Sequence, residues 1–164
     1  MTRTILLNIF CLLIVSLSYG QNKVKTLSGR GVYGGKYIVY DGSYNGYKKF
    51  PIDANRREIQ ILILDDNNIE KLPLWISNLP NLRVLSLRNN NLKEIDPIIT
   101  SCTKLEVLLL SGNPNLTDLP VLWSCENLRL INVVGTGIHD APNYVPMMKK
   151  LRYFRYSKKP KKRK

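Results

Sequence analysis

An aliphatic residue recurs at a fixed interval of 23 residues over most of this chain. Each residue of this series begins the same pattern, with further apolar residues three and five positions later. Self-similarity at a fixed spacing indicates stacked units, because one unit cannot bury its own apolar face without neighbours. The series is Ile59, Leu82, Leu105, Leu128 and Leu151.

The first part of each unit predicts a short strand followed by a turn. Apolar residues at the third and fifth positions share one face of a strand, since successive side chains point to opposite faces. Asn67, Asn90 and Asn113 stand at the eighth position, where a short amide can bond to turning backbone. Stacking then predicts a ladder of asparagines that weakens towards the C-terminus, where Thr136 and Lys159 take this position.

The second part of each unit predicts a short helical turn. In every unit, the residues three and six positions before the next unit are apolar, as one face of a helical turn requires. We call each set of equivalent residues across the units a column. A proline precedes each segment, and its fixed φ suits the first helical position. The prolines are Pro73, Pro97, Pro120 and Pro142, and the columns are Leu79, Cys102, Cys125 and Met148, and Ile76, Ile99, Leu122 and Val145.

The segments LRVLSLRNNNLKEI and LEVLLLSGNPNLTDLP resemble leucine-rich repeats of the form L-x-x-L-x-L-x-x-N-x-L. The resemblance covers residues 59–156, as four full repeats and one partial repeat. It implies an α/β fold class, a solenoid with short parallel strands on the concave face and short helices or turns on the convex face. It also implies the usual function of such proteins, which is to bind protein partners.

Residues 1–20 have the pattern of a secretory signal. Arg3 precedes an apolar run from Ile5 to Leu17, and small residues at Ser18 and Gly20 suit cleavage before Gln21. We therefore expect a secreted, periplasmic or otherwise extracytoplasmic protein. The alternative is an uncleaved anchor, although thirteen residues span only about 20 Å of helix, less than the ~30 Å hydrocarbon core.

Residues 21–58 precede the clear repeats and are expected to cap them. Tyr40 and Asn45 fit a degenerate repeat that would start 22 residues before the first clear one, with aromatic residues in place of leucine. The alternative is an independent hairpin, with Tyr37–Tyr40 as a strand. Five tyrosines between Tyr33 and Tyr47 favour aromatic core filling over a sugar or peptide site. Glycines 29, 31 and 34 match a dinucleotide-binding spacing, but lack the preceding strand and following helix that such a site needs.

The charge is concentrated at the C-terminus. The net charge is +13, yet residues 149–164 hold ten basic residues and no acidic one, while residues 21–148 hold 14 basic and 12 acidic residues. A nearly neutral body does not predict a specific nucleic-acid surface. One histidine, no nucleophile–base pair and no phosphate loop predict a non-catalytic protein with no cofactor, metal or small-molecule substrate.

The basic tail, residues 157–164, supports a second hypothesis. We expect it to be a solvated segment, but it could instead attach the protein to an anionic membrane or polymer, because each Lys or Arg near acidic lipid contributes ~1 kcal/mol. The cationic residues of this hypothesis are Lys158, Lys159, Lys161, Lys162, Arg163 and Lys164.

The concave face is the predicted partner-binding surface. Strand positions that do not enter the core form an apolar stripe flanked by arginines, a composition suited to an interface because apolar burial supplies energy and arginine fixes orientation. Cys102 and Cys125, one repeat apart, are either buried thiols or a disulfide between neighbouring repeats. The predicted surface consists of Arg83, Val84, Arg88, Val107, Leu109, Arg129, Leu130, Asn132, Arg152, Tyr153 and Arg155.

Overall fold

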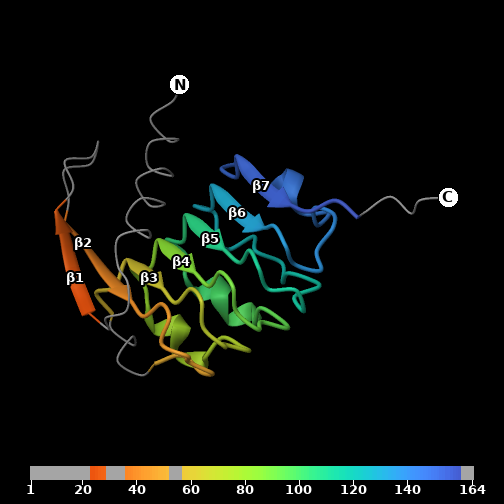
Figure 1. Ribbon diagram of the computed structural model, residues 1–164. Coiled ribbons are helices and arrows are strands. Elements are labelled where there is room, and N and C mark those ends of the chain that lie inside the picture. Colours follow the sequence, from red (N-terminus) through yellow and green to blue (C-terminus); the bar gives the residue numbers. More distant parts are fainter. Residues whose placement is uncertain (1–22, 29–35, 52–56, 160–164) are drawn as a thin grey trace.

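The computed structural model describes residues 23–28, 36–51 and 57–159, which form a curved solenoid around one seven-stranded sheet (Figure 1). The strands follow one another across the sheet in chain order, and all neighbours are parallel except β1 and β2. The strands are β1 (Lys23–Ser28), β2 (Lys36–Asp41), β3 (Ile61–Ile63), β4 (Val84–Ser86), β5 (Val107–Leu109), β6 (Leu130–Val133) and β7 (Tyr153–Tyr156).

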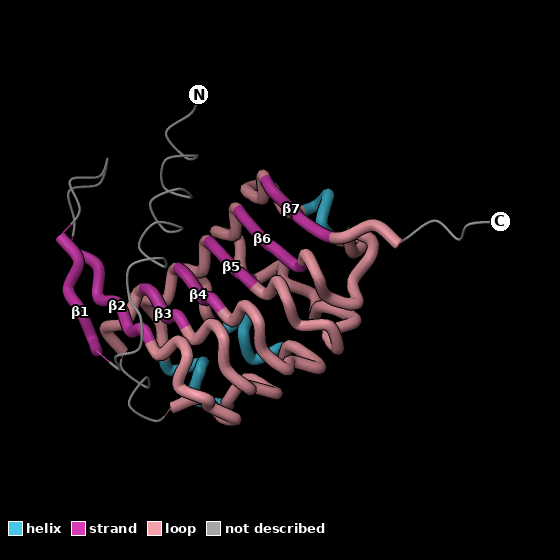
Figure 2. Tube along the Cα trace, viewed as in Figure 1, coloured by secondary structure: helices cyan, strands magenta, loops and turns pink. Residues whose placement is uncertain are grey.

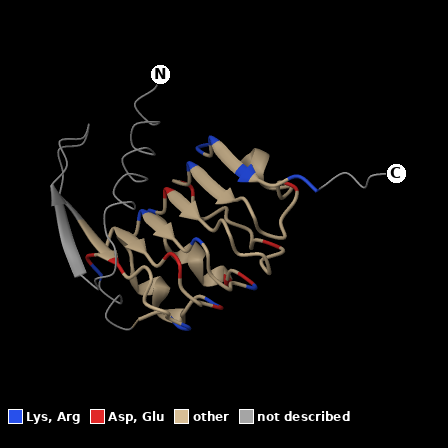
Figure 3. Cartoon of the chain, in the orientation of Figure 1, with Lys and Arg blue, Asp and Glu red and all other residues tan. Residues whose placement is uncertain are grey.

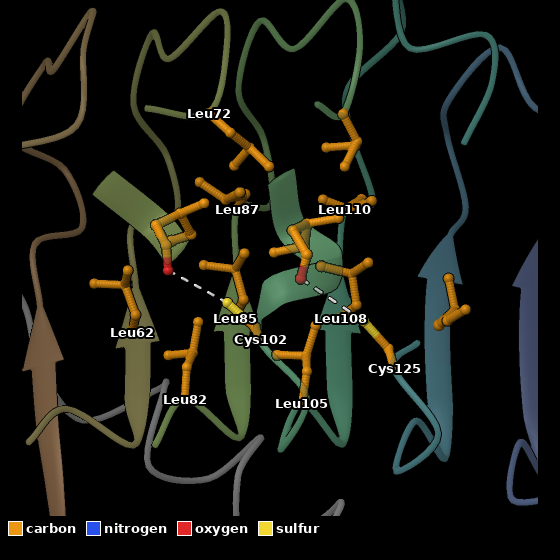
Figure 4. Packing of buried hydrophobic residues seen from close by; sticks show 14 of the residues in the cluster. Leu62, Leu72, Leu82, Leu85, Leu87, Cys102, Leu105, Leu108, Leu110 and Cys125 are labelled. Atoms are coloured by element: carbon orange, nitrogen blue, oxygen red, sulfur yellow. Dashed lines mark hydrogen bonds between the residues drawn. The ribbon is translucent and has the colours of Figure 1, made fainter. Parts of the chain in front are cut away.

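The parallel register follows the repeat. Val84 pairs with Val107, and Val107 pairs with Leu130, each 23 residues further along the chain. Leu85 and Leu87 are fully buried on the other face, beside their equivalents in the neighbouring repeats (Figure 4). The predicted α/β solenoid with parallel strands is therefore confirmed, and its main core lies between the sheet and the convex segments.

The convex side carries short 3₁₀ helices and turns (Figure 2). In the described residues the helices are η2 (Leu74–Asn78), η3 (Pro97–Ser101) and η4 (Val145–Met147), and none forms between Pro120 and Leu128. Only Pro97 takes the first helical position, where the Asp96 carboxylate also caps the helix by accepting from the Ile98 N–H at 2.8 Å. Pro73 is the N-cap residue of η2 and directly precedes it, whereas Pro142 lies three residues before η4 and no helix follows Pro120 in its repeat. The prediction that each proline opens a helix was therefore wrong for Pro120 and Pro142, although the apolar columns behind the prolines are packed into the core.

The asparagine ladder joins neighbouring repeats. Asn90 donates to the carbonyl of Leu64 in the preceding repeat at 2.9 Å and accepts from the Ile69 N–H at 2.9 Å. Thr136 instead bonds only within its own repeat, to the carbonyl of Val133 and the N–H of Ile138. The predicted weakening of the ladder towards the C-terminus is thus observed.

The N-terminal part combines the two arrangements considered for it. β2 pairs in parallel with β3 at an offset of 22 residues, and Tyr40 lies beside Leu62 in the core as a degenerate repeat requires. β2 also forms an antiparallel pair with β1, which makes a hairpin at this edge of the sheet. The predicted signal (residues 1–20) and the three glycines between 29 and 34 lie outside the described residues.

The two cysteines of the repeats are buried thiols. Cys102 and Cys125 point towards the carbonyls of Ile76 and Ile99, one repeat earlier, at 3.4 and 3.7 Å (Figure 4). Burial raises the pKa of the Cys102 thiol to about 12 and that of Cys125 to about 11. Side chains in a stacked column point the same way, which is why each sulfur meets a carbonyl rather than the other sulfur.

Candidate protein-binding surface

The apolar stripe of the concave face is present but tightly packed. It forms a second apolar cluster on the face of the sheet opposite the main core, and its members are only 2–9% exposed. The predicted contact residues Val84, Val107, Leu109 and Leu130 belong to it and offer little accessible surface. The full cluster is Val39, Ile61, Ile63, Val84, Val107, Leu109 and Leu130.

A row of charges runs along one end of the strands. Glu106 is held between Arg83, at 2.5 Å, and Arg129, at 3.9 Å. The two arginine side chains remain 42% and 37% exposed, whereas the Glu106 side chain is 15% exposed. The carboxylate therefore orients two accessible guanidinium groups, and the three residues together keep one net positive charge.

A buried polar network lies at the other end of β3 and β4. Of its residues, only Arg88 was among the predicted partner contacts. The carboxylate of Asp65 accepts from the Ser86 hydroxyl at 2.6 Å and from the Arg88 Nε at 2.8 Å. The ion pair with Arg88 is 2.7 Å long. Burial raises the pKa of Asp65, because desolvation of the carboxylate outweighs the stabilising effects of Arg88 and Ser86. This network fixes Arg88 rather than leaving it available to a ligand.

Apart from the Arg83 guanidinium, the accessible part of the concave face lies towards the C-terminal end. Arg152, Tyr153 and Arg155 of the last repeat are exposed, and Tyr153 is exposed by 37%. Val134 follows β6 and is 42% exposed, next to half-buried Asn132, whose side chain accepts from the Val134 N–H. We call Arg129, Val134, Arg152, Tyr153 and Arg155 the C-terminal concave surface. The sequence pattern did not single out Val134, because its position carries polar residues in the other repeats.

The basic end of the chain adjoins this surface. Figure 3 shows lysines and arginines gathered at β7 and along the segment that follows it. Lys158 and Lys159 are exposed. The remaining predicted tail contacts, Lys161, Lys162, Arg163 and Lys164, lie outside the described residues.

A small open hollow lies near the turn that follows β6. It has a volume of about 310 Å³ and is lined in part by Asp118, His139 and Lys159. The His139 ring donates through Nδ1 to the carbonyl of Ser157 at 2.9 Å, which ties the ring to the backbone. Within residues 23–28, 36–51 and 57–159, acidic, histidine and cysteine side chains nowhere gather as a metal-binding group would. The same part of the chain contains no helix with the length and apolarity to cross a bilayer.

Comparison with known proteins agrees with this architecture. The family model described as Leucine Rich repeats (2 copies) matches residues 57–100 and 80–122. No curated protein matches the chain in sequence.

Solved structures with the same fold come from distant organisms. A leucine-rich-repeat protein of Leptospira interrogans is 30% identical, with a TM-score of 0.54, over 65% of this chain and 28% of its own length. The ectodomain of the receptor kinase SOBIR1 from Arabidopsis thaliana is 20% identical, with a TM-score of 0.59, over 91% of this chain and 90% of its own. A chain of the Drosophila melanogaster SNF/U2A' complex is 23% identical, with a TM-score of 0.56, over 86% of this chain and 83% of its own.

This chain thus spans little more than a quarter of the Leptospira protein, and the two more distant structures share its fold. The family model, the parallel register and the asparagine ladder all describe the same stacked unit. The chain therefore has the leucine-rich-repeat fold, and its residues 57–122 match the leucine-rich-repeat family.

Proposed function

We propose that this protein is a non-catalytic binding protein that holds a protein partner on its C-terminal concave surface. The observation that carries the proposal is the exposure of Tyr153 among arginines, whereas the apolar side chains on the rest of the sheet face are packed. Tyrosine and arginine are enriched at the energetic centres of protein interfaces, because each combines a large contact area with directed polar groups. A repeat solenoid provides the extended, rigid support that such a surface needs.

Capture from the native extract tests this proposal with a matched pair of variants. The double substitution Arg129→Ala/Tyr153→Ala removes one cation and one exposed apolar side chain from the proposed surface. The control Lys71→Ala/Leu74→Ala does the same outside the sheet, at the start of η2 and just before it, where both residues are exposed. We expect a partner that binds the wild type and the control but not the concave variant. A partner lost equally from both variants would contradict the proposal.

The proposal includes export, with residues 1–20 as the signal. The arrangement of Arg3, the apolar run and the small residues before Gln21 supports it. N-terminal sequencing of the protein from its native source should begin at Gln21. A mature chain that retains Met1 would contradict cleavage.

A second candidate function is attachment to an anionic membrane or polymer. Lys149, Lys150, Lys158 and Lys159 are all exposed at one end of the solenoid, and residues 149–159 contain no acidic residue. Vesicles with and without 30 mol% phosphatidylserine would test it, since that attraction is electrostatic and weakens with salt. Salt-sensitive binding that is lost on deletion of residues 158–164 would favour attachment through the tail.

A further inference from the structure

The last strand carries hydrogen-bonding groups that every earlier repeat uses to hold the next one. The N–H groups of Leu64, Leu87 and Leu110 donate to the carbonyls of Ser86, Leu109 and Asn132, at 2.9, 2.8 and 2.8 Å. Tyr156 is the equivalent residue in β7, which is the edge of the sheet. The N–H of Tyr153 points at β6. Because successive N–H groups along a strand point to opposite sides, the N–H of Tyr156 points away from β6, to the open edge.

The core is also open at this edge. In the inner repeats Leu82, Leu85 and Leu87 are fully buried, whereas their equivalents Leu151, Phe154 and Tyr156 are only half-buried. Phe154 and Tyr156 pack against each other, with ring centroids 5.9 Å apart, and leave part of both rings accessible. An added strand with apolar side chains on this face would continue the core by one layer.

The charge at this edge selects the kind of strand that can be added. Six basic residues and no acidic one lie between 149 and 159, and all six are exposed. A second copy of this chain would place its own basic strand beside them, and like charges across a strand pair are unfavourable. A segment with acidic side chains gains attraction instead of repulsion. The six residues are Lys149, Lys150, Arg152, Arg155, Lys158 and Lys159.

We propose that β7 accepts an extended acidic segment of a partner protein as an additional strand of the sheet. Apolar side chains at alternate positions of that segment cover Phe154 and Tyr156. Acidic side chains between them face the side of the sheet that carries Arg155. This mode of binding uses backbone hydrogen bonds for affinity and alternate side chains for specificity. It goes beyond the proposed concave function, because the contact is made along the edge of the sheet.

A designed peptide tests this proposal on the full chain. The probe is an eight-residue peptide of alternating Glu and Val, and its control has the same composition as a block of four Glu followed by four Val. We expect the alternating peptide to bind at least tenfold more tightly and to slow hydrogen exchange at the Tyr156 amide. Equal affinity for both peptides, or unchanged exchange at Tyr156, would overturn the proposal and leave simple charge attraction.

Substitutions at the edge provide the second arm. Tyr156→Pro removes the outward N–H at a position where an edge strand tolerates proline, while Tyr156→Ile keeps the N–H and removes the ring. We expect Tyr156→Pro to abolish peptide binding and Tyr156→Ile to retain it. Should the proline variant fail to fold, Arg155→Glu against the control Lys71→Glu gives the same comparison by charge alone. Peptide binding unaffected by Tyr156→Pro, or reduced equally by the two charge reversals, would contradict strand addition.

One further variant separates this proposal from the concave one. Arg129→Ala lies in the row of charges beside β6, away from the outer edge of β7. We expect it to weaken capture of the concave partner and to leave the affinity for the alternating peptide unchanged. A large loss of peptide affinity in Arg129→Ala would show that the peptide occupies the concave surface, and would overturn the assignment to the edge.

Discussion

The side-chain amide of Asn113 donates to the carbonyl of Leu87, 26 residues earlier in the chain, at 2.9 Å. Asn113 is fully buried, and it also donates to Leu110 and accepts from the N–H of Leu92. One side chain therefore satisfies buried backbone groups of two successive repeats.

Replacement of Asn113 by Ala should lower the free energy of unfolding by about 3 kcal/mol, since each buried backbone group left without a partner costs ~1–3 kcal/mol. Thr136→Ala is the matched control at the same repeat position, and it should cost only about 1 kcal/mol because it leaves only the N–H of Ile138 without its partner, since the Val133 carbonyl still accepts from the N–H of Thr136. Urea denaturation of both variants measures the difference. Equal losses would show that the ladder does not couple repeats.

The buried Asp65 should make stability depend on pH in an unusual direction. Its pKa is raised by burial, so the native state holds this proton at pH values where the unfolded chain has released it. Ionisation therefore favours the unfolded chain, and stability falls as the pH rises from about 4 through the raised pKa. Asp65→Asn removes this titration and should be less destabilising at pH 7 than at pH 4. A larger loss at pH 7 would mean that the ion pair with Arg88 dominates over desolvation.

The cysteines of the repeats should be inert while the protein is folded. Burial raises the pKa of Cys102 to about 12 and that of Cys125 to about 11, and thiolate is the form that reacts. Iodoacetamide at pH 8 should leave both unmodified in the native state and label both in urea, as peptide mapping by mass spectrometry would show. Rapid native labelling of Cys125 would contradict its burial.

Two glycines with similar backbone conformations should differ in their tolerance of a methyl group. Gly46 and Gly112 have φ of 66° and 73°, so alanine is strained at both by roughly 1–2 kcal/mol. A Cβ at Gly46 meets no atom within 4 Å, whereas one at Gly112 would lie 2.1 Å from the Oδ1 of Asn89. Asn89 in turn donates to Asp66. Gly112→Ala should therefore lower the melting temperature clearly more than Gly46→Ala, and equal shifts would contradict the packing at Gly112.

The repeat spacing predicted the strands and the core, because a column of apolar side chains at a fixed interval has few ways to be buried. It did not predict the convex geometry, because a proline precedes the segment in every repeat, yet a helix follows directly at Pro73 and Pro97 and none follows Pro120 in its repeat. Nor did it predict that the concave stripe would be packed. The ion pair between Asp65 and Arg88 was not predicted either, although the two residues lie one period apart. A charge pair between neighbouring repeats can be buried or exposed, and the sequence alone does not distinguish the two cases.

If the C-terminal concave surface holds a protein partner, site-specific photo-crosslinking should capture that partner from this surface and not from the convex side. A benzophenone amino acid is placed at Tyr153 on the concave side or at Leu74 on the convex side, which are 37% and 75% exposed. Because Leu74 is the more accessible, non-specific capture would favour it. We expect one discrete crosslinked protein from position 153 in the native compartment and none from position 74. The same product from both positions, or from position 74 alone, would contradict it.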